Sequence, residues 1–251
     1  MSLIVNPTPR LNSALSLKGQ GGFWVLLLGI FFPFICGFTS MTFWWGGVKI
    51  ITLAVLSYLA GSVPFGLIIS KKVKGLDVRK FGSGNIGATN VVRVVGLKWG
   101  VLVFILDFLK GFLPVILVFF FLQPENKFIN ISAIITALLA ITGHNWPVFL
   151  KFKGGKGVST SLGVITALSG GLPFLRIPLL ISLGSWIAVF LIFRIVGLAS
   201  IITSLTFFIS CLSLQNIPLE FKILSFLIFS FITIRHKKNI QELLVNKKKR
   251  S

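Results

Sequence analysis

Small and polar residues are concentrated in the segment FGSGNIGATN, residues 81–90, although the chain around it is strongly apolar. Glycines let successive backbone N–H groups point into one concavity, which is a common arrangement for binding an anion. Ser83, Asn85 and Asn90 add side-chain donors, and Arg93 adds a positive charge. This composition predicts a site for a phosphate group. The alternative is a flexible connector that happens to be basic.

A second glycine-rich segment, KGGKG, covers Lys153 to Gly157 and leads directly into an apolar run that begins at Val158. If that run is a helix, its free N–H groups and the positive end of its dipole face an anion. Lys153 and Lys156 would add point charges for a phosphate. The spacing differs from that of a nucleotide-binding P-loop, because the spacer between the first glycine and Gly-Lys is missing. The alternative is an ordinary basic loop.

The third polar segment, RHKKNIQELLVN, covers residues 235–246. His236 and Asn239 are three positions apart, so they share a face if the segment is helical. A lone histidine at the end of an apolar run is usually structural. This segment therefore indicates a functional site only in combination with the two glycine-rich segments.

Ionisable residues also occur inside apolar runs, where an unpaired charge is costly. Asp107 lies within the run 101–122, and Lys110 follows about one helical turn later. The two could form a structural ion pair, or Asp107 could orient Lys110 in a cavity. His144 precedes a predicted bend at residues 145–147, where it could act as a base or simply hold the loop.

Several reaction types lack the residues that they usually need. No HxxxxD acyltransferase box starts at His144, because the fifth residue after it is Phe149. Carboxylates are too few and too scattered for a two-metal phosphoryl-transfer site. The two cysteines lie in apolar runs without metal or disulfide spacing. We therefore expect no metal ion and no cofactor, and a chemistry that uses positive charge, amides and hydroxyls.

Membrane-spanning helices must position these segments. The chain is 55% hydrophobic with a mean hydropathy of +0.95, and its apolar residues form runs of about 20. We expect an all-α integral membrane protein, a seven-transmembrane-helix bundle formed by residues 48–251. Residues 1–47 are an N-terminal extension in which Phe23–Phe38 could be a signal sequence, an anchor or an extra hydrophobic helix. The predicted spans are Val48–Ile69, Trp99–Leu122, Ile131–Leu150, Val158–Phe174, Pro178–Phe193, Val196–Leu214 and Phe221–Ile234.

Positive charge is distributed unevenly between the ends of these spans. The formal net charge is +20. Nucleic-acid binding is the common explanation of such a charge, but here the positive residues cluster at span ends, so we expect no nucleic-acid partner. They lie in residues 71–98 and 151–157, at Arg194 and in the tail from Arg235, whereas the opposite ends carry only Lys49, Lys127, Arg176 and Lys222. The positive-inside rule therefore places the three polar segments on the cytoplasmic face, with the tail near anionic lipid.

These motifs together resemble those of the bacterial acyl-phosphate-dependent glycerol-3-phosphate acyltransferases. The similarity rests on GSVPFG with GSGNIGATNVVR, on GHNWPVFLKFKGGKGVST and on HKKNI, and LDFLKG is also similar. It covers residues 48–245 and leaves residues 1–40 outside. The family's third motif usually continues to a glycine and then a glutamate, whereas the matching positions here are Asn246 and Lys248.

The resemblance implies a fold, a reaction and a set of site residues. The fold would have seven spans, and the reaction would transfer an acyl group from acyl phosphate to the 1-hydroxyl of glycerol 3-phosphate, giving lysophosphatidic acid. Ser83, Arg93, His236 and Asn239 would be catalytic. The substrates would be held by Asn85, Asn90, Lys110, Lys153, Gly154, Gly155, Lys156, Gly157 and Ser200. We expect a monomer in the bacterial plasma (inner) membrane.

Two questions have more than one answer at this point: which group accepts the hydroxyl proton, and whether the protein is an enzyme or a transporter. The base could be His236, whose pKa range is suitable, or an oxygen of a substrate phosphate. The competing function is transport of an organic phosphate, but transporters tend to place their polar groups near the midplane, often in paired halves.

Overall fold

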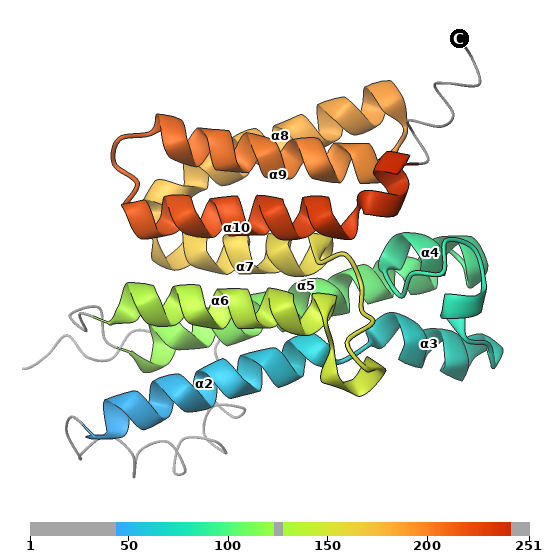
Figure 1. Ribbon diagram of the computed structural model, residues 1–251, viewed down its shortest axis with the longest axis horizontal. Helices are drawn as coiled ribbons and strands as arrows, with labels where there is room; N and C mark the ends of the chain where they lie inside the picture. Colours follow the sequence, from blue (N-terminus) through green and yellow to red (C-terminus); the bar gives the residue numbers. More distant parts are fainter. Residues whose placement is uncertain (1–43, 123–127, 242–251) are drawn as a thin grey trace, which may run out of the picture. The chain divides into compact units, whose positions relative to one another are not determined.

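The computed structural model describes residues 44–122 and 128–241, and every regular element in these two ranges is helical. The two glycine-rich segments predicted to bind phosphate lie in loops that lead into helices (Figure 1). The N-terminal candidate Phe23–Phe38, Lys127, and the third-motif positions Asn246 and Lys248 lie outside the described residues. The helices are α2 Trp44–Ser62, α3 Phe65–Lys74, α4 Ala88–Val94, α5 Leu97–Phe121, α6 Ile129–Asn145, α7 Val158–Gly171, α8 Arg176–Phe193, α9 Val196–Ser213 and α10 Leu219–Arg235. Short 3₁₀ turns are η1 Val78–Lys80, η2 Val148–Leu150 and η3 Pro173–Leu175.

In the described part of the chain, five segments are long and apolar enough to cross a membrane: Gly47–Lys74, Leu97–Phe121, Ile129–Leu150, Pro173–Phe193 and Val196–Ser213. The helices at two other predicted spans are shorter than these five segments. α7, predicted as Val158–Phe174, ends at Gly171, and α10, predicted as Phe221–Ile234, has 17 residues. For residues 44–122 and 128–241 the structure thus confirms an all-helical fold with several apolar helices of spanning length.

The predicted span Val48–Ile69 lies within the membrane-length segment Gly47–Lys74, but its helix is interrupted between α2 and α3. Pro64 lacks an N–H and restricts the residue before it, so α2 ends at Ser62 and α3 starts at Phe65. α3 then carries Lys71, Lys72 and Lys74 in its last turn and ends at a left-handed glycine, Gly75. The apolar helix α2 is thus followed by a short helix with a basic last turn, which lies at the same end of the helical unit as the polar loops.

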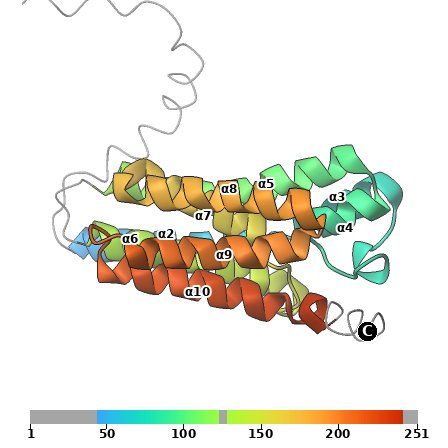
Figure 2. The same cartoon turned by 90° about the horizontal axis from the view of Figure 1, so that it is seen from above.

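Within residues 47–251 the long helices run alternately in opposite directions (Figures 1 and 2). Helix α5 packs against α7 and α6, while α9 packs between α8 and α10. Small residues allow the backbones to approach closely, as in many membrane helix pairs. A Cβ added to Gly163 of α7 would lie 2.1 Å from the Phe108 carbonyl oxygen of α5, and one added to Gly143 of α6 would lie 2.3 Å from the Tyr58 carbonyl oxygen of α2.

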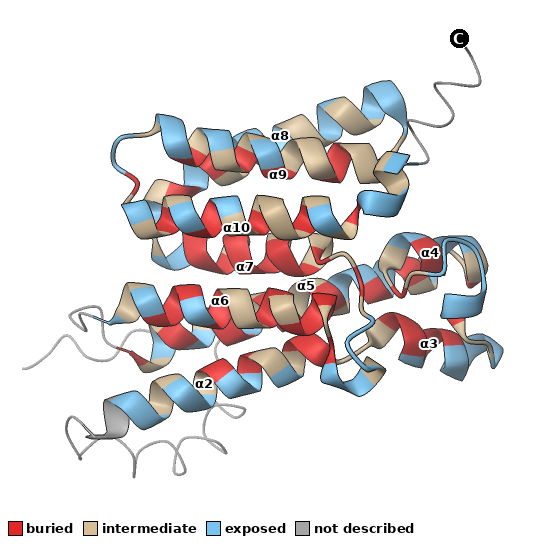
Figure 3. Ribbon diagram, in the orientation of Figure 1, coloured by how far each residue is buried: buried red, intermediate tan, exposed pale blue. Residues whose placement is uncertain are grey.

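Apolar side chains are divided between an interior and an outward-facing surface. The main buried cluster joins residues of α5, α6, α7 and α10, including Val115, Ile141, Leu168 and Phe221. Buried positions are frequent on α6 and α7, whereas α8 is largely exposed or intermediate (Figure 3). Its Ile192 is 71% exposed. Such outward apolar surface fits a hydrocarbon environment.

The loops with polar motifs lie at one end of this helical unit. The η1–α4 region, the α6–α7 loop and the C-terminal end of α10 all lie toward the right-hand end of the unit in both Figure 1 and Figure 2. A smaller buried cluster supports this end, with Leu67, Val78, Ile86 and Val91 among its members. Leu150 of η2 packs against that cluster, so the first and second motifs share part of their apolar support.

Candidate active site

The first motif is a loop built around the buried side chain of Asn90. Its amide nitrogen donates to the carbonyl oxygens of Val78 at 3.1 Å, Phe81 at 3.1 Å and Asn85 at 2.8 Å. Its side-chain oxygen accepts from the Ser83 backbone N–H at 2.9 Å. These contacts use the hydrogen-bonding capacity of the amide. Asn90, predicted to bind substrate, therefore holds the shape of the loop.

This arrangement leaves the other predicted residues of the first motif at the surface of the loop. Ser83 and Arg93 are exposed. Asn85 is half-buried, and its side chain accepts from the Gly87 N–H at 2.8 Å. Gly82 and Gly84 have φ values of 59° and 70°, a region that favours glycine and explains the spacing of FGSGN. The loop thus presents Ser83 and Arg93 for contact with a ligand.

An ion pair fixes the start of the same loop. Arg79 and Asp77 interact at 2.6 Å, and the Asp77 carboxylate also accepts from the Arg79 backbone N–H at 3.0 Å. The hydrogen bonds from Arg79 lower the pKa of Asp77 to about 2. Asp77 therefore stays ionised at neutral pH and offsets part of the positive charge of this end.

The second motif ends at the beginning of α7, as predicted. Gly157 precedes the helix with a φ of 78° and supplies no side-chain cap for its first N–H groups. Buried polar groups surround this helix start. The Asn145 side-chain amide and the Thr160 hydroxyl have no hydrogen-bond partner among the described residues, and a Cβ on Gly157 would lie 2.6 Å from the Asn145 side-chain oxygen. Together with Lys156, this geometry is suited to a bound anion.

Arg235 at the end of α10 connects the second motif to the third. Its Nε donates to the Gly155 carbonyl at 2.8 Å, and one terminal nitrogen donates to the Gly154 carbonyl at 2.6 Å. The guanidinium also lies over the Trp146 ring, 5.7 Å from its centroid. Arg235 therefore holds the KGGKG loop in place, although it lies 80 residues after Gly155 in the chain.

The lysines of the second motif differ in their surroundings. Lys156 is half-buried and donates to the Asn239 side-chain oxygen, which is a second link between the motifs. Lys153 is exposed. The structure thus gives Lys156 a fixed position and leaves Lys153 able to reach a ligand.

His236 and Asn239 share a face, as their spacing predicts. A Cβ on Gly197, near the start of α9, would lie 3.5 Å from both side chains. Ser200 lies three positions after Gly197, hence on a similar face of α9, and donates to the Val196 carbonyl at 2.8 Å. The structure therefore brings α9 and the third motif together, with Ser200 one turn away.

The protonation state of His236 follows from its position. Its Nδ1 lies 2.7 Å from the Ile232 carbonyl oxygen, which can only accept, so Nδ1 carries the hydrogen. Burial and the nearby Lys156 charge lower the pKa of His236 to about 4, although the Ile232 contact opposes this. The ring is consequently neutral at pH 7, and its Nε2 lone pair can accept a proton.

Asp107, Lys110 and His144 form a buried polar cluster below the loops. Lys110 pairs with Asp107 at 2.7 Å and donates to the Val63 carbonyl at 2.9 Å, which the break after α2 exposes. His144 Nδ1 lies 3.7 Å from the same Asp107 oxygen. A Cβ on Gly155 would lie 2.0 Å from His144 Nε2, so the ring directly supports the KGGKG loop. This packing favours the loop-holding role of His144 over that of a base.

A family model described as glycerol-3-phosphate acyltransferase matches residues 51–246. The chain belongs to the glycerol-3-phosphate acyltransferase family. It is 40% identical over 203 residues to the glycerol-3-phosphate acyltransferase of Aquifex aeolicus, covering 81% of this chain and 100% of that one. Over 204 residues it is 38% identical to glycerol-3-phosphate acyltransferase 2 of Thermotoga maritima, covering 80% of this chain and 93% of the relative.

Solved structures of the family are similar in fold. The crystal structure of PlsY, an integral membrane glycerol 3-phosphate acyltransferase, in its glycerol 3-phosphate form gives a TM-score of 0.68 at 39% identity. Its lysophosphatidic acid form gives 0.66 at 38% identity, and each match covers 79% of this chain and 93% of the other. The similarity to integral membrane enzymes confirms that this chain is a multi-pass membrane protein.

Sequence reasoning did not identify two residues that build the site, Arg235 and Tyr58. Arg235 was counted only as a basic residue, although it clamps Gly154 and Gly155. Tyr58 donates to the Trp146 carbonyl at 2.9 Å and so ties α2 to the α6–α7 loop. The available signal was the presence of Trp146 and Arg235 directly inside the quoted motifs, but their partners are distant in sequence.

Proposed function

We propose that the protein transfers a fatty acyl group from acyl phosphate to the 1-hydroxyl of glycerol 3-phosphate, giving lysophosphatidic acid and phosphate. Family membership makes the chain an acyltransferase. The related PlsY structures are described in a glycerol 3-phosphate form and a lysophosphatidic acid form. One observation of this chain carries the proposal: Arg235 and Asn239 bind the KGGKG loop at the start of α7, at the end that also carries the Ser83 loop.

The site supplies what this reaction requires. Two phosphorylated substrates must be held together, and an oxyanion develops when the hydroxyl attacks the acyl carbon. The free N–H groups at the α7 start and Lys156 suit the phosphate of glycerol 3-phosphate, with Lys153 within the same loop. Ser83 and Arg93 of the first loop suit the second phosphate. We assign Asn90, Asp107 and His144 to the support of these groups.

The transfer balances without a nucleophile on the protein. The glycerol oxygen forms a bond to the acyl carbon, and the bond from that carbon to the phosphate oxygen breaks. Inorganic phosphate leaves with the bonding electron pair. The hydroxyl proton goes to His236 Nε2 or to a phosphate oxygen, and the neutral state of His236 at pH 7 keeps the first route open.

We also propose a seven-span topology with the motif end facing the cytoplasm of a bacterial cell, in its plasma membrane. The alternating directions of α2 and α5–α10 support it (Figure 1). Most basic residues of the described helices and loops lie at the motif end. α7 and α10 would complete the seven, because their short lengths are compatible with a locally thin bilayer. We propose that the working unit is a monomer.

The reaction is tested with purified protein in detergent. Acyl phosphate and glycerol 3-phosphate are supplied without added metal or coenzyme A, and lysophosphatidic acid is measured. Lys156→Ala and Lys153→Ala are expected to raise the KM for glycerol 3-phosphate more than that for acyl phosphate. Lys72→Ala, which removes an exposed charge from α3 at the same end, is the control. No product from the unaltered protein would refute the activity, and unchanged kinetics in both loop variants would refute the assigned roles.

A further inference from the structure

The loop between α6 and α7 exposes two phenylalanines beside a lysine. Phe149 and Phe152 are each 59% exposed, and Lys151 between them is exposed as well. Leu150, in contrast, packs against the buried cluster that includes Leu67 of α3. Phe149, Lys151 and Phe152 therefore form a small amphipathic surface, the Phe149–Phe152 surface. Exposed apolar patches mark contact with a membrane or with another protein.

The backbone of this loop is held in the conformation that exposes the two rings. Lys151 and Phe152 have φ values of 50° and 61°, a left-handed region that is unusual for a side chain as large as phenylalanine. The Phe152 N–H donates to the Pro147 carbonyl at 2.9 Å, and the Lys153 N–H donates to the Leu150 carbonyl at 3.1 Å. Such backbone strain persists only where surrounding contacts outweigh it, and it is frequent at functional sites. The exposed rings are thus a fixed feature of the loop.

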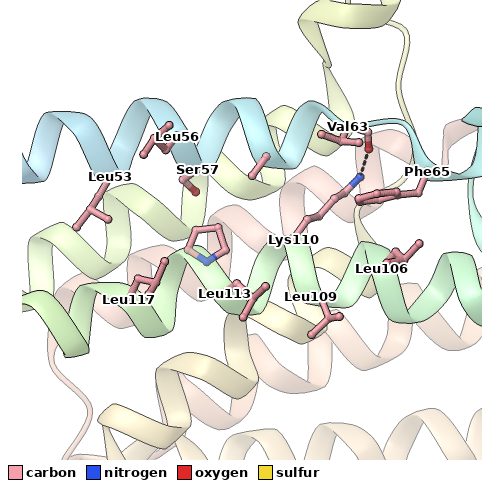
Figure 4. Close-up of a pocket in the computed structure, with 12 residues that line it drawn as sticks. Leu53, Leu56, Ser57, Val63, Phe65, Leu106, Leu109, Lys110, Leu113 and Leu117 are labelled. Atoms are coloured by element: carbon pink, nitrogen blue, oxygen red, sulfur yellow. Dashed lines mark hydrogen bonds between the residues drawn. The ribbon is translucent and has the colours of Figure 1, made fainter. Parts of the chain in front are cut away.

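The lipid-facing surface of α2 ends at the helix break. An apolar groove between α2 and α5 includes Leu56 and Leu113, which are 56% and 49% exposed, so it opens onto the surface that faces lipid (Figure 4). Val63 and Phe65 lie at one end of this groove, where the Val63 carbonyl accepts from Lys110 at 2.9 Å (Figure 4). Beyond this end, α3 finishes in a turn with three lysines. The break therefore lies near the boundary between hydrocarbon and headgroups.

The Phe149–Phe152 surface lies near the same boundary. The hydroxyl of Tyr58, one turn before α2 ends at Ser62, donates to the Trp146 carbonyl at 2.9 Å, directly before the loop. The membrane-length segment Ile129–Leu150 also ends within the loop. Aromatic and basic side chains are common at this depth, because their apolar parts can contact hydrocarbon while their polar parts reach the headgroups.

We propose that the Phe149–Phe152 surface is an interfacial anchor for anionic phospholipid. The two rings insert between lipid molecules, and the Lys151 ammonium group binds a lipid phosphate. The surface and its ligand are complementary, because an anionic phospholipid carries its charge at the end of an apolar body, as the surface carries a lysine between two rings. The anchor comes directly before the KGGKG segment, so it also fixes that segment relative to the membrane surface.

The depth of the loop is tested in phosphatidylcholine nanodiscs. Phe149→Cys and Phe152→Cys are made separately in a chain with Cys36→Ser and Cys211→Ala, and each new thiol is labelled with a small fluorophore. Insertion of about 5–10 Å below the surface should let lipid brominated on its acyl chains quench both labels about twofold or more, while aqueous iodide quenches them little. Lys80→Cys, at an exposed position of the same end, is the matched control and should show the reverse.

The contact with anionic lipid is tested with two quenchers. Brominated phosphatidylglycerol and brominated phosphatidylcholine are compared at equal mole fraction, with the label at position 149. Attraction by Lys151 should enrich the anionic lipid by up to about fivefold beside the label, so it should quench more strongly. Lys151→Gln should remove most of this preference. Lys80→Gln, which removes another exposed lysine of the same end, should retain it.

The outcomes decide the two parts of the proposal separately. If iodide quenches the labels at positions 149 and 152 as strongly as the label at position 80, and brominated lipid leaves them bright, the anchor is refuted and the exposed rings are open to another protein. If Phe152→Cys does not fold, position 149 decides, because it lies outside the left-handed pair. Equal quenching by both brominated lipids, or an unchanged preference in Lys151→Gln, overturns the contact of Lys151 with anionic lipid. The measurement requires no turnover, so it is independent of the proposed function.

Discussion

Replacing Arg235 by alanine should weaken the use of glycerol 3-phosphate without a comparable effect on acyl phosphate. Arg235 donates to the carbonyl oxygens of Gly154 and Gly155 and lies over Trp146. Hydrogen bonds from a charged group contribute about 1.5–3 kcal/mol each. Because the guanidinium is only half-buried, the lower value applies. The two bonds are then worth roughly 3 kcal/mol, or about 100-fold to 200-fold in kcat/KM if the loop must be closed for catalysis.

The assay is steady-state kinetics with each substrate varied in turn, together with thermal unfolding of the detergent-solubilised protein. Arg235→Lys keeps the charge but cannot make both bonds, so its loss should be intermediate, about tenfold. Arg194→Ala removes an exposed arginine that caps the end of α8 and controls for the change in net charge. Equal kinetics for Arg235→Ala and Arg194→Ala would refute the view that Arg235 fixes the KGGKG loop.

Three further changes test other parts of the site. The pKa of His236 is about 4 in the folded protein and about 6.5 in an unfolded chain, so its contribution to stability is fully present above pH 6.5 and is lost as the pH falls toward 4. The pH–rate profile of the unaltered protein should therefore show no loss of activity from protonation of His236 above pH 5. His236→Gln should lower kcat by about 10²-fold or more if the ring is the base. Asn90→Ala should lower the midpoint of thermal unfolding and the activity together, because three carbonyls lose their donor and each lost bond costs about 1 kcal/mol, whereas an unchanged midpoint would contradict its supporting role. Gly155→Ala should reduce turnover because its Cβ meets the His144 ring, and the double variant with His144→Ala should recover more activity than additivity allows if that contact is the cause.

Some contacts within the candidate site follow from the sequence, whereas others depend on residues that are distant in the chain. KGGKG was expected to bind a phosphate, and His236 and Asn239 were expected to share a face; the structure links the two motifs through Lys156 and Asn239. Arg235 was missed because its partners Gly154 and Gly155 are 81 and 80 residues away. Asn90 was expected to touch substrate, yet its amide is used within the loop. A side chain's type shows which bonds it can make, but only its neighbours show which bonds it makes.

The sequence by itself determined that the chain is a helical membrane protein with glycine-rich, basic motifs and an uneven distribution of charge. Those properties are local, because hydropathy, glycine spacing and the position of lysines can be read over a few turns of helix. Only the tertiary structure decided that α2 ends at Ser62, that Lys110 binds the carbonyl of Val63 in the break that follows, and that a groove opens between α2 and α5. These features depend on which helices pack together. The close approach of the helices involves glycines and partners that are distant in the chain, Gly143 with Tyr58 and Gly163 with Phe108.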